Sequence, residues 1–138
     1  MKYFIDTEFI ESGPTKPITL LSLGIAAEDG RIYYAQAIPE DPWPTPNDFV
    51  ARHVFPHLSH FDMGKRVPAC SASTQSCAGC PWRRLWELRA DVMRFCNEKL
   101  HGTPEFWGYY ADYDWVVFCQ IFGAMSAPRV GGHNTATT

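Results

Sequence analysis

The sequence predicts a mixed α/β domain whose sheet opens with an antiparallel meander. Three apolar or aromatic segments of strand length, separated by turn residues, occupy residues 2–38. Two segments with helical spacing of apolar residues follow residue 81, and a short aromatic segment lies between them. The length of 138 residues fits one domain with its own core.

The meander follows from the order of strands and turns. Residues 2–9 are rich in aromatic and β-branched side chains, which predicts a strand. The Glu-Ser-Gly-Pro run at 11–14 is expected to end this strand. Residues 18–27 form a continuous apolar run, which predicts a strand buried on both faces. An Asp-Gly turn separates this run from a third strand at 31–38, as in a tight hairpin.

The rest of the chain is expected to alternate loops and helices. A short helix is expected within 48–58, after a proline-rich loop. The strongest helical pattern covers 82–100, with Pro81 before it and Gly102 after it. A strand at 105–110 and a second helix from Asp112 to Gly123 complete the core.

These elements predict a core at 1–125 and an irregular tail at 126–138. Residues 64–81 are small, polar and rich in cysteine, which predicts a flexible insertion within the core. No apolar run is long enough for a signal peptide or a membrane span, so a cytoplasmic protein is expected. A net charge of −3 argues against broad phosphate binding, and any basic patch is expected to be local.

Asp6 and Glu8 are the first residues that suggest chemistry. Strand side chains alternate between faces, so these two carboxylates are expected side by side on the first strand. Two close carboxylates repel unless a cation lies between them, and oxygen clusters of this kind bind Mg²⁺ or Mn²⁺. The alternative is an acidic edge that only faces solvent. The apolar neighbours Phe4, Ile5 and Phe9 favour the metal site.

A second acidic pair lies where a strand ends and the last helix begins. Asp112 is best interpreted as the cap of that helix, and Asp114 falls inside its first turn. Asp114 could simply complement the helix dipole. The presence of Asp6 and Glu8 favours a role for it at the same metal site.

Three blocks of sequence resemble the DEDD superfamily of 3′-5′ exonucleases. They are DTEFIE, LLSLGIAAEDGRIYYA and GYYADYDWVVFCQIFG, and the similarity covers about residues 1–60 and 82–125. The branch that the chain looks like comprises small stand-alone bacterial and phage enzymes (the mycobacterial 3′-5′ exoribonuclease-like group and phage exonuclease A). This resemblance implies an RNase H-like fold, with a mixed sheet, flanking helices and a truncated C-terminus.

The resemblance also implies a two-metal mechanism acting on the 3′ end of single-stranded RNA or DNA. Two Mg²⁺ or Mn²⁺ ions, about 3.5–4 Å apart in such sites, activate a water and stabilise the leaving oxygen. Asp6 would bridge the ions, while Glu8 and Asp114 would each hold one. Thr7, inside the first motif, and Phe9, directly after it, are the residues assigned to nucleic-acid binding. Phe9 is assigned because aromatic rings stack on unpaired bases.

The third motif of that superfamily is incomplete here. His133 stands in an HNTATT run where the family has a histidine or tyrosine that orients the attacking water. Thr138 stands where the last metal-binding aspartate is expected. The chain is therefore expected to be an impaired nuclease. The alternatives are an inactive relic that binds nucleic acid or a partner, and a fragment that does not fold.

Cys70, Cys77 and Cys80 form a C-x6-C-x2-C pattern in the expected insertion. A structural zinc site takes four ligands, and a histidine among residues 53–60 would have to complete this one. A loop without zinc is the favoured interpretation. Cys96 and Cys119 have apolar helical neighbours, which predicts packing in the core.

Overall fold

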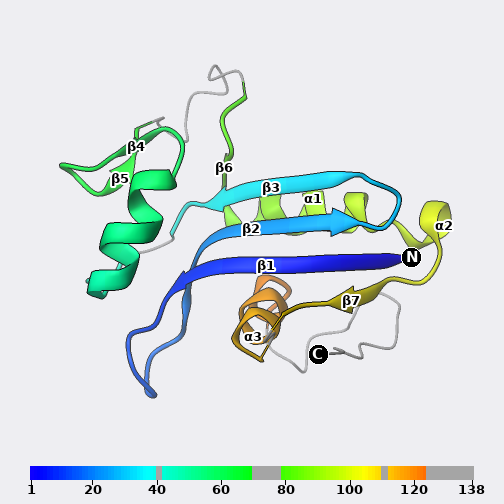
Figure 1. Ribbon diagram of the computed structural model, residues 1–138, viewed down its shortest axis with the longest axis horizontal. Coiled ribbons are helices and arrows are strands. Elements are labelled where there is room, and N and C mark those ends of the chain that lie inside the picture. Colours follow the sequence, from blue (N-terminus) through cyan, green and yellow to red (C-terminus); the bar gives the residue numbers. More distant parts are fainter. Residues whose placement is uncertain (40–41, 70–78, 110–111, 124–138) are drawn as a thin grey trace.

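A five-stranded mixed sheet forms the centre of the domain (Figure 1). The computed structural model describes residues 1–39, 42–69, 79–109 and 112–123. The strand order is β6-β3-β2-β1-β7, in which β1–β2 and β2–β3 pair antiparallel while β1–β7 and β3–β6 pair parallel. The strands are β1 (Lys2–Ile10), β2 (Thr19–Ala27), β3 (Ile32–Ala37), β6 (Trp82–Arg83) and β7 (Glu105–Trp107).

The predicted meander is confirmed. The turn between β2 and β3 is closed by two backbone hydrogen bonds, from Ala27 N to Arg31 O and from Gly30 N to Ala27 O. Gly30 has a φ of 89°, a conformation that other residues adopt only under strain. The prediction that β2 is buried on both faces holds for Leu21 to Leu23, whereas Ala26 is exposed.

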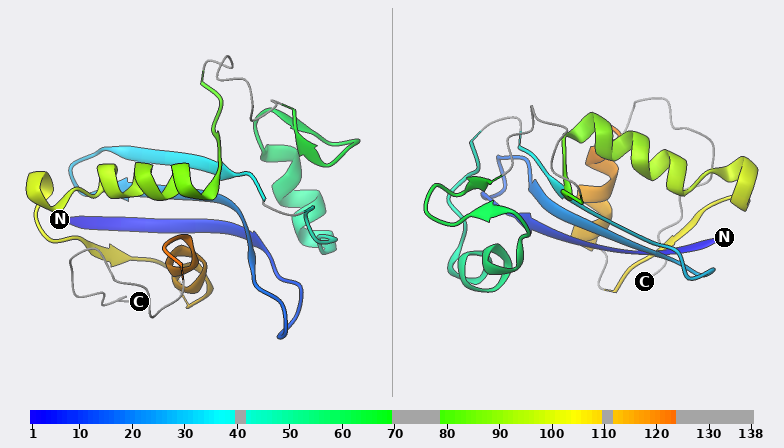
Figure 2. Two further views of the ribbon diagram at one scale, coloured as in Figure 1. Left: turned by 180° about the vertical axis from the view of Figure 1, so that it is seen from behind. Right: turned by 90° about the horizontal axis from the view of Figure 1, so that it is seen from above.

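Both long helices cover the same face of the sheet. α1 (Leu85–Phe95) and α3 (Asp112–Ile121) lie together on one side in the right-hand view of Figure 2, and α2 (Glu98–His101) is a single turn after α1. Alternate residues of the strands face these helices. The main core consists of Tyr3, Ile5, Leu23, Ile25, Ala27, Ala35, Ala37, Leu88, Val92, Cys96, Phe106, Phe118 and Ile121.

The helix predicted at 82–100 is shorter than expected. Trp82 and Arg83 pair in parallel with Gln36 and Ala37, so they extend the sheet before α1 begins at Leu85. The Trp82 side chain is almost completely buried, and this packing outweighs the local helical pattern. The strand predicted at 105–110 is also shorter and ends at Trp107.

A small lobe lies at one end of the sheet. It contains η1 (Val50–Val54), η2 (Phe55–His57) and a hairpin of β4 (Phe61–Asp62) with β5 (Val67–Pro68). The first part of the expected insertion at 64–81 therefore belongs to this hairpin, and residues 70–78 lie outside the described residues. A second core joins the lobe to the sheet through Ile10, Leu21, Val50, Val54, Phe55, Leu58 and Trp82.

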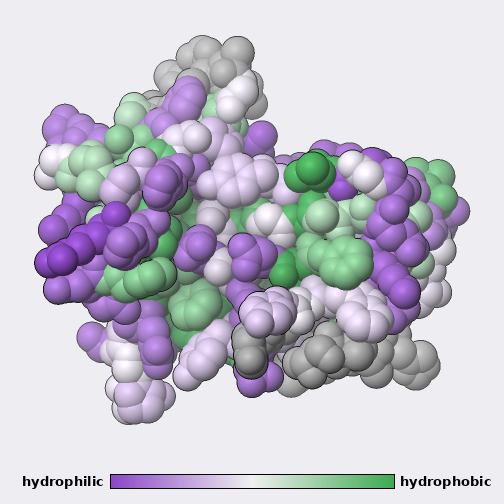
Figure 3. Space-filling model, in the orientation of Figure 1, coloured by the Kyte–Doolittle hydropathy of each residue, from purple (hydrophilic) through white to green (hydrophobic). Residues whose placement is uncertain are grey.

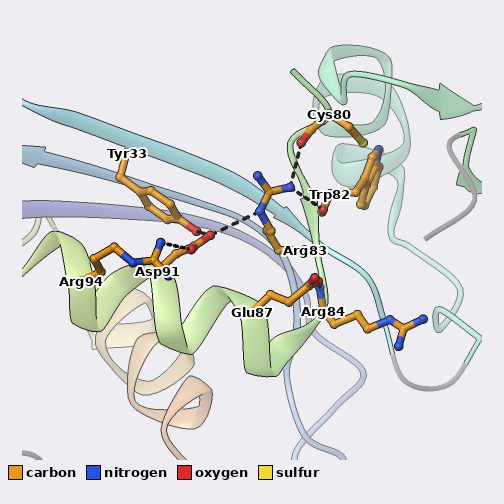
Figure 4. A network of polar contacts seen from close by, with 8 residues as sticks. All are labelled: Tyr33, Cys80, Trp82, Arg83, Arg84, Glu87, Asp91 and Arg94. Carbon is orange, nitrogen blue, oxygen red and sulfur yellow. Dashed lines mark hydrogen bonds and ion pairs between the residues drawn. The ribbon is translucent and has the colours of Figure 1, made fainter. Parts of the chain in front are cut away.

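A polar network fixes β6 and α1 to the sheet (Figure 4). One carboxylate oxygen of Asp91 accepts hydrogen bonds from the Tyr33 hydroxyl and from Arg83 Nε, both at 3.3 Å. Its other oxygen accepts from Arg94 at 3.0 Å, and Arg83 also donates to the backbone oxygen of Cys80. Arg83 thus acts within the fold.

Gln36 attaches the lobe to the sheet. Its side chain is fully buried, and its amide exchanges two hydrogen bonds with the backbone of Ser59, with Nε2 to O at 2.8 Å and Ser59 N to Oε1 at 2.7 Å. The Trp82 indole also donates to the Ser59 oxygen, at 2.9 Å. The lobe therefore depends on polar as well as apolar contacts.

Replacing Gln36 by leucine is expected to destabilise the protein. The Ser59 N–H would lose its acceptor in a partly buried position, which costs about 1–3 kcal/mol in the free energy of unfolding. Urea-induced unfolding measures this change, with Glu11→Gln as a control because Glu11 is exposed. A midpoint equal to that of the wild type would contradict the structural role of Gln36.

The other face of the sheet is covered by neither α1 nor α3, and the lobe contacts it at Gln36. Cross-strand register arranges its central side chains in three rows, each of which runs from β1 through β2 to β3. The rows are Phe4–Ala26–Ile32, Asp6–Gly24–Tyr34 and Glu8–Ser22–Gln36. Phe4 is 48% exposed, Ile32 79% and Tyr34 49%, and Figure 3 shows hydrophobic side chains gathered over the strands. This open face is the side on which the two carboxylates of β1 lie.

Candidate active site

Asp6 and Glu8 lie side by side on the open face, as their spacing predicts. Both side chains are exposed, while Ile5 and Thr7 between and beside them are buried toward the helices. Across β2 they face Gly24 and Ser22, which are small. The carboxylates are thus held on a regular strand, with open space beside them.

The pairing of β1 with β2 is interrupted directly after Glu8. Glu8 pairs with Ser22 and Phe9 with Leu20, so Leu21 is an extra residue in β2. Such a bulge bends the strand and increases its twist, and bulges are frequent beside active sites. Here the bulge turns Leu21 into the core of the lobe.

Asp114 reaches β1 from the first turn of α3. Its Oδ1 accepts a hydrogen bond from the backbone N–H of Thr7 at 3.0 Å and a second, shorter one from the Thr7 hydroxyl. Parallel pairing with β7 stops at Phe4 and Trp107, so the Thr7 N–H has no strand partner on this edge. Asp114 therefore supplies an acceptor that the sheet does not.

A ring contact adds to this junction between β1 and α3. Phe9 stacks on Tyr113, with ring centroids 5.8 Å apart and an angle of 20° between the planes. Trp115, the residue after Asp114 on the same helix, packs against Phe106 and Phe118 in the core. The first turn of α3 is therefore held at the end of β1 by contacts on both sides of Asp114.

The three carboxylates act on one another electrostatically. Partial desolvation raises the pKa of Asp6, and the negative charge of Asp114 raises it further. The pKa of Glu8 is raised by desolvation, then by Asp6, then by Asp114. No ion pair within the described residues compensates the charge of Asp6 or Glu8. This concentration of negative charge is the main electrostatic feature of the open face.

The chemistry of these residues suits a hard divalent cation. Asp6 and Glu8 have no ion-pair partner in the described part of the chain, and their carboxylate oxygens are the donors that Mg²⁺ and Mn²⁺ prefer. Asp114 keeps Oδ2 available, because Thr7 occupies only Oδ1. In the described part of the chain, no three histidine, cysteine or acidic side chains stand close enough together to form a complete metal cluster.

The raised pKa values predict that Asp6→Asn increases the thermal stability of the metal-free protein at pH 7. A raised folded-state pKa means that the folded protein binds protons more readily, so stability falls as pH rises through the pKa. The ordinary values are 3.8 for Asp6 and 4.5 for Glu8, and the raised values lie above them. The gain from Asp6→Asn should therefore shrink toward zero as the pH falls below about 4.

Thermal unfolding with chelator, followed across the acidic range up to neutral pH, checks this prediction. Glu11→Gln removes an exposed carboxylate beyond the end of β1 and is the matched control. A pH-independent difference between Asp6→Asn and the wild type would show that the ionisation of Asp6 is not its cause.

Some of the other residues singled out in the sequence lie within the described part of the chain, and others lie outside it. His133, Thr138, Cys70 and Cys77 lie outside the described residues. Cys80 packs against the core of the lobe. Asp112, predicted as a cap, is the first residue of α3, and its side chain is exposed.

Sequence reasoning missed the contribution of β3 to this face. Tyr34 and Gln36 share rows with Asp6 and Glu8, and no motif marks them. The side chains of residues 32–37 alternate between the two faces of the sheet, and the Asp-Gly turn sets the register of the hairpin. Together these two signals could have placed Tyr34 and Gln36 on the open face.

A cavity on the helix side of the sheet lies apart from these carboxylates. It has a volume of about 470 Å³ and opens between the helices and the ends of β2 and β3. Its lining consists of Pro17, Ile18, Thr19, Leu20, Ala37, Ile38, Pro39, Pro42, Pro44, Leu85, Val117, Gln120, Ile121 and Gly123. None of these side chains is an acid, a base or a metal ligand, so the carboxylates of the open face remain the better candidate for chemistry.

Comparison with known proteins gives two relatives from Mycobacterium tuberculosis, one from strain CDC 1551 and one from strain H37Rv. Both are named 3′-5′ exoribonuclease, and each is 38% identical to the chain over 127 residues. The alignment covers 92% of the chain and 64% of each relative, so the chain spans slightly less than two thirds of their length. No family model matches the chain. Within the described residues, no helix is long and apolar enough to cross a membrane.

Proposed function

Because the chain is related to proteins named 3′-5′ exoribonuclease, we propose that its open face carries the active site of a metal-dependent 3′-5′ exonuclease. The substrate is the 3′ end of single-stranded RNA or DNA. The observation that carries this proposal is the position of Asp114, which accepts a hydrogen bond from Thr7, the residue between Asp6 and Glu8. Desolvation raises the pKa of Asp6 and Glu8, and the charge of Asp114 adds to both. Unpaired carboxylates in this arrangement are costly without a cation.

Asp6 and Glu8 are the residues proposed to hold the metal, with Asp114 as the third. Bound Mg²⁺ or Mn²⁺ would supply Lewis-acid chemistry, by which a water becomes a nucleophile and the leaving oxygen is stabilised. The chain's own contribution is positional. β1 keeps Asp6 and Glu8 on one face, and the two hydrogen bonds from Thr7 hold Asp114 at the strand edge.

Phe9 is proposed to contact the nucleic acid, whereas Thr7 is proposed to position a metal ligand. Phe9 stacks on Tyr113, which is 52% exposed, so this pair offers an aromatic surface beside the carboxylates. Thr7 is buried and donates to Asp114, which makes it a positioning residue for the metal site. His133 remains the proposed group for orienting the attacking water, by the resemblance alone.

The rate of this chain is expected to be low. Thr138 stands where the resemblance places the last metal-binding aspartate, and a threonine hydroxyl is a weaker ligand than a carboxylate. A second candidate function, binding of nucleic acid without cleavage, is favoured by the engagement of Asp114 with Thr7. Cleavage of labelled single-stranded substrates, with an Asp6→Asn control, separates the two candidates.

A further inference from the structure

The middle row of the open face has an unusual composition. It runs from Asp6 on β1 through Gly24 on β2 to Tyr34 on β3. A Cβ atom at Gly24 would lie 3.8 Å from the backbone oxygen of Asp6, an ordinary contact, so packing does not require a glycine there. The consequence of the glycine is open space between the carboxylate and the aromatic ring.

Tyr34 is held in place by its hydroxyl group. The hydroxyl donates to Gln36 Oε1 at 3.1 Å, and Gln36 is itself fixed by its two hydrogen bonds with Ser59. Burial raises the pKa of Tyr34, a hydrogen bond with the Ser22 side chain opposes this rise, and the charge of Glu8 adds to it. The hydroxyl end of the ring is thus anchored within the third row, beside Glu8.

The rest of the ring remains accessible. Tyr34 is 49% exposed although its hydroxyl has partners, so the exposed part includes the ring itself. A ring fixed in advance loses little conformational entropy when a ligand binds to it. Base stacking on such a ring contributes about 1–3 kcal/mol per base, with little dependence on sequence.

We propose that Tyr34 is a stacking platform for an unpaired base of the nucleic-acid substrate, and that the space over Gly24 admits the rest of that nucleotide. The strands of Asp6 and Tyr34 are two steps apart, or about 10 Å at the usual strand spacing. This separation is within the reach of one nucleotide from its phosphate to its base. The proposal rests on the proposed function, because it assigns the phosphate to the carboxylate-bound metal.

The test measures binding separately from cleavage. A single-stranded RNA with 2-aminopurine near its 3′ end is titrated with the full chain in Ca²⁺, and gel analysis confirms that the RNA stays intact. Fluorescence quenching reports stacking of the labelled base. Tyr34→Leu is expected to weaken binding by about 5–150-fold, the equivalent of one stacked base, and to abolish much of the quenching.

Two further variants separate stacking from folding. Tyr34→Phe keeps the ring but loses the hydrogen bond that anchors it, so its binding should fall far less than that of Tyr34→Leu. Gly24→Val favours the strand conformation but fills the space beside Asp6, so it should weaken binding while the protein remains folded. Trp86→Leu is the matched control, because Trp86 is an exposed aromatic residue on α1, which covers the opposite face.

The outcomes distinguish this proposal from the proposed function. Equal binding by the wild type and Tyr34→Leu, in a protein that shortens RNA, would overturn the stacking role and leave the nuclease intact. Equal losses in Tyr34→Phe and Tyr34→Leu would also overturn it, because the hydroxyl would then be the important group. A folded wild type that neither binds nor shortens RNA would overturn both proposals.

Discussion

Asp6→Asn is expected to abolish metal-dependent shortening of single-stranded RNA. Asp6 is one of the carboxylates proposed to hold the metal, and a bound metal would provide several kcal/mol of transition-state stabilisation. Losing about 4 kcal/mol corresponds to a rate reduction of roughly a thousandfold. Because an asparagine side chain has nearly the same size and shape as an aspartate, the fold should survive the change.

The measurement is stepwise shortening of a 5′-labelled single-stranded RNA and its DNA counterpart, in Mn²⁺, Mg²⁺ or chelator. Glu11→Gln is the matched control, since it removes an exposed carboxylate that has no place in the proposed site. Shortening that persists in Asp6→Asn would mean that the cleavage uses another site. A folded wild type that shortens neither substrate would favour the alternative of binding without cleavage.

Mn²⁺ is expected to raise the midpoint of thermal unfolding of the wild type by about 10 °C. A ligand present at a hundred times its dissociation constant stabilises the folded state by about 2.7 kcal/mol. For a domain of this size, each kcal/mol shifts the midpoint by roughly 3–5 °C. The gain has a specific source here, because a cation favours the charged form of Asp6 and Glu8, whose pKa values are raised first by desolvation and then by neighbouring carboxylates.

Unfolding in Mn²⁺, before and after addition of chelator, tests this effect. Asp6→Asn and Glu8→Gln should each lose most of the shift, while Glu11→Gln should keep it. An equal shift in all of these proteins would point to binding elsewhere on the acidic surface. Metal binding without cleavage would identify the site as a relic that still holds an ion.

Local sequence patterns determined the parts of this protein that depend on neighbouring residues. The alternation of side chains along a strand placed Asp6 and Glu8 on one face, and the Asp-Gly turn produced the hairpin of β2 and β3. Gly123 comes shortly after α3, near the predicted end, whereas Gly102 follows the short α2 because the predicted helix at 82–100 already ends at Phe95. These features need no information from distant segments, because the period of a strand or the conformation of a turn is set within a few residues.

Only the tertiary structure decided how distant segments meet. The helical pattern that starts at Trp82 yields to pairing with Gln36, because burial of the tryptophan outweighs local propensity. The contact of Asp114 with Thr7 joins residues 107 positions apart, and the anchoring of Tyr34 depends on Gln36 and Ser59. The sequence by itself determined that two carboxylates stand together on the first strand. Which groups surround them depends on strand register and helix packing, which are set by contacts between segments far apart in the chain.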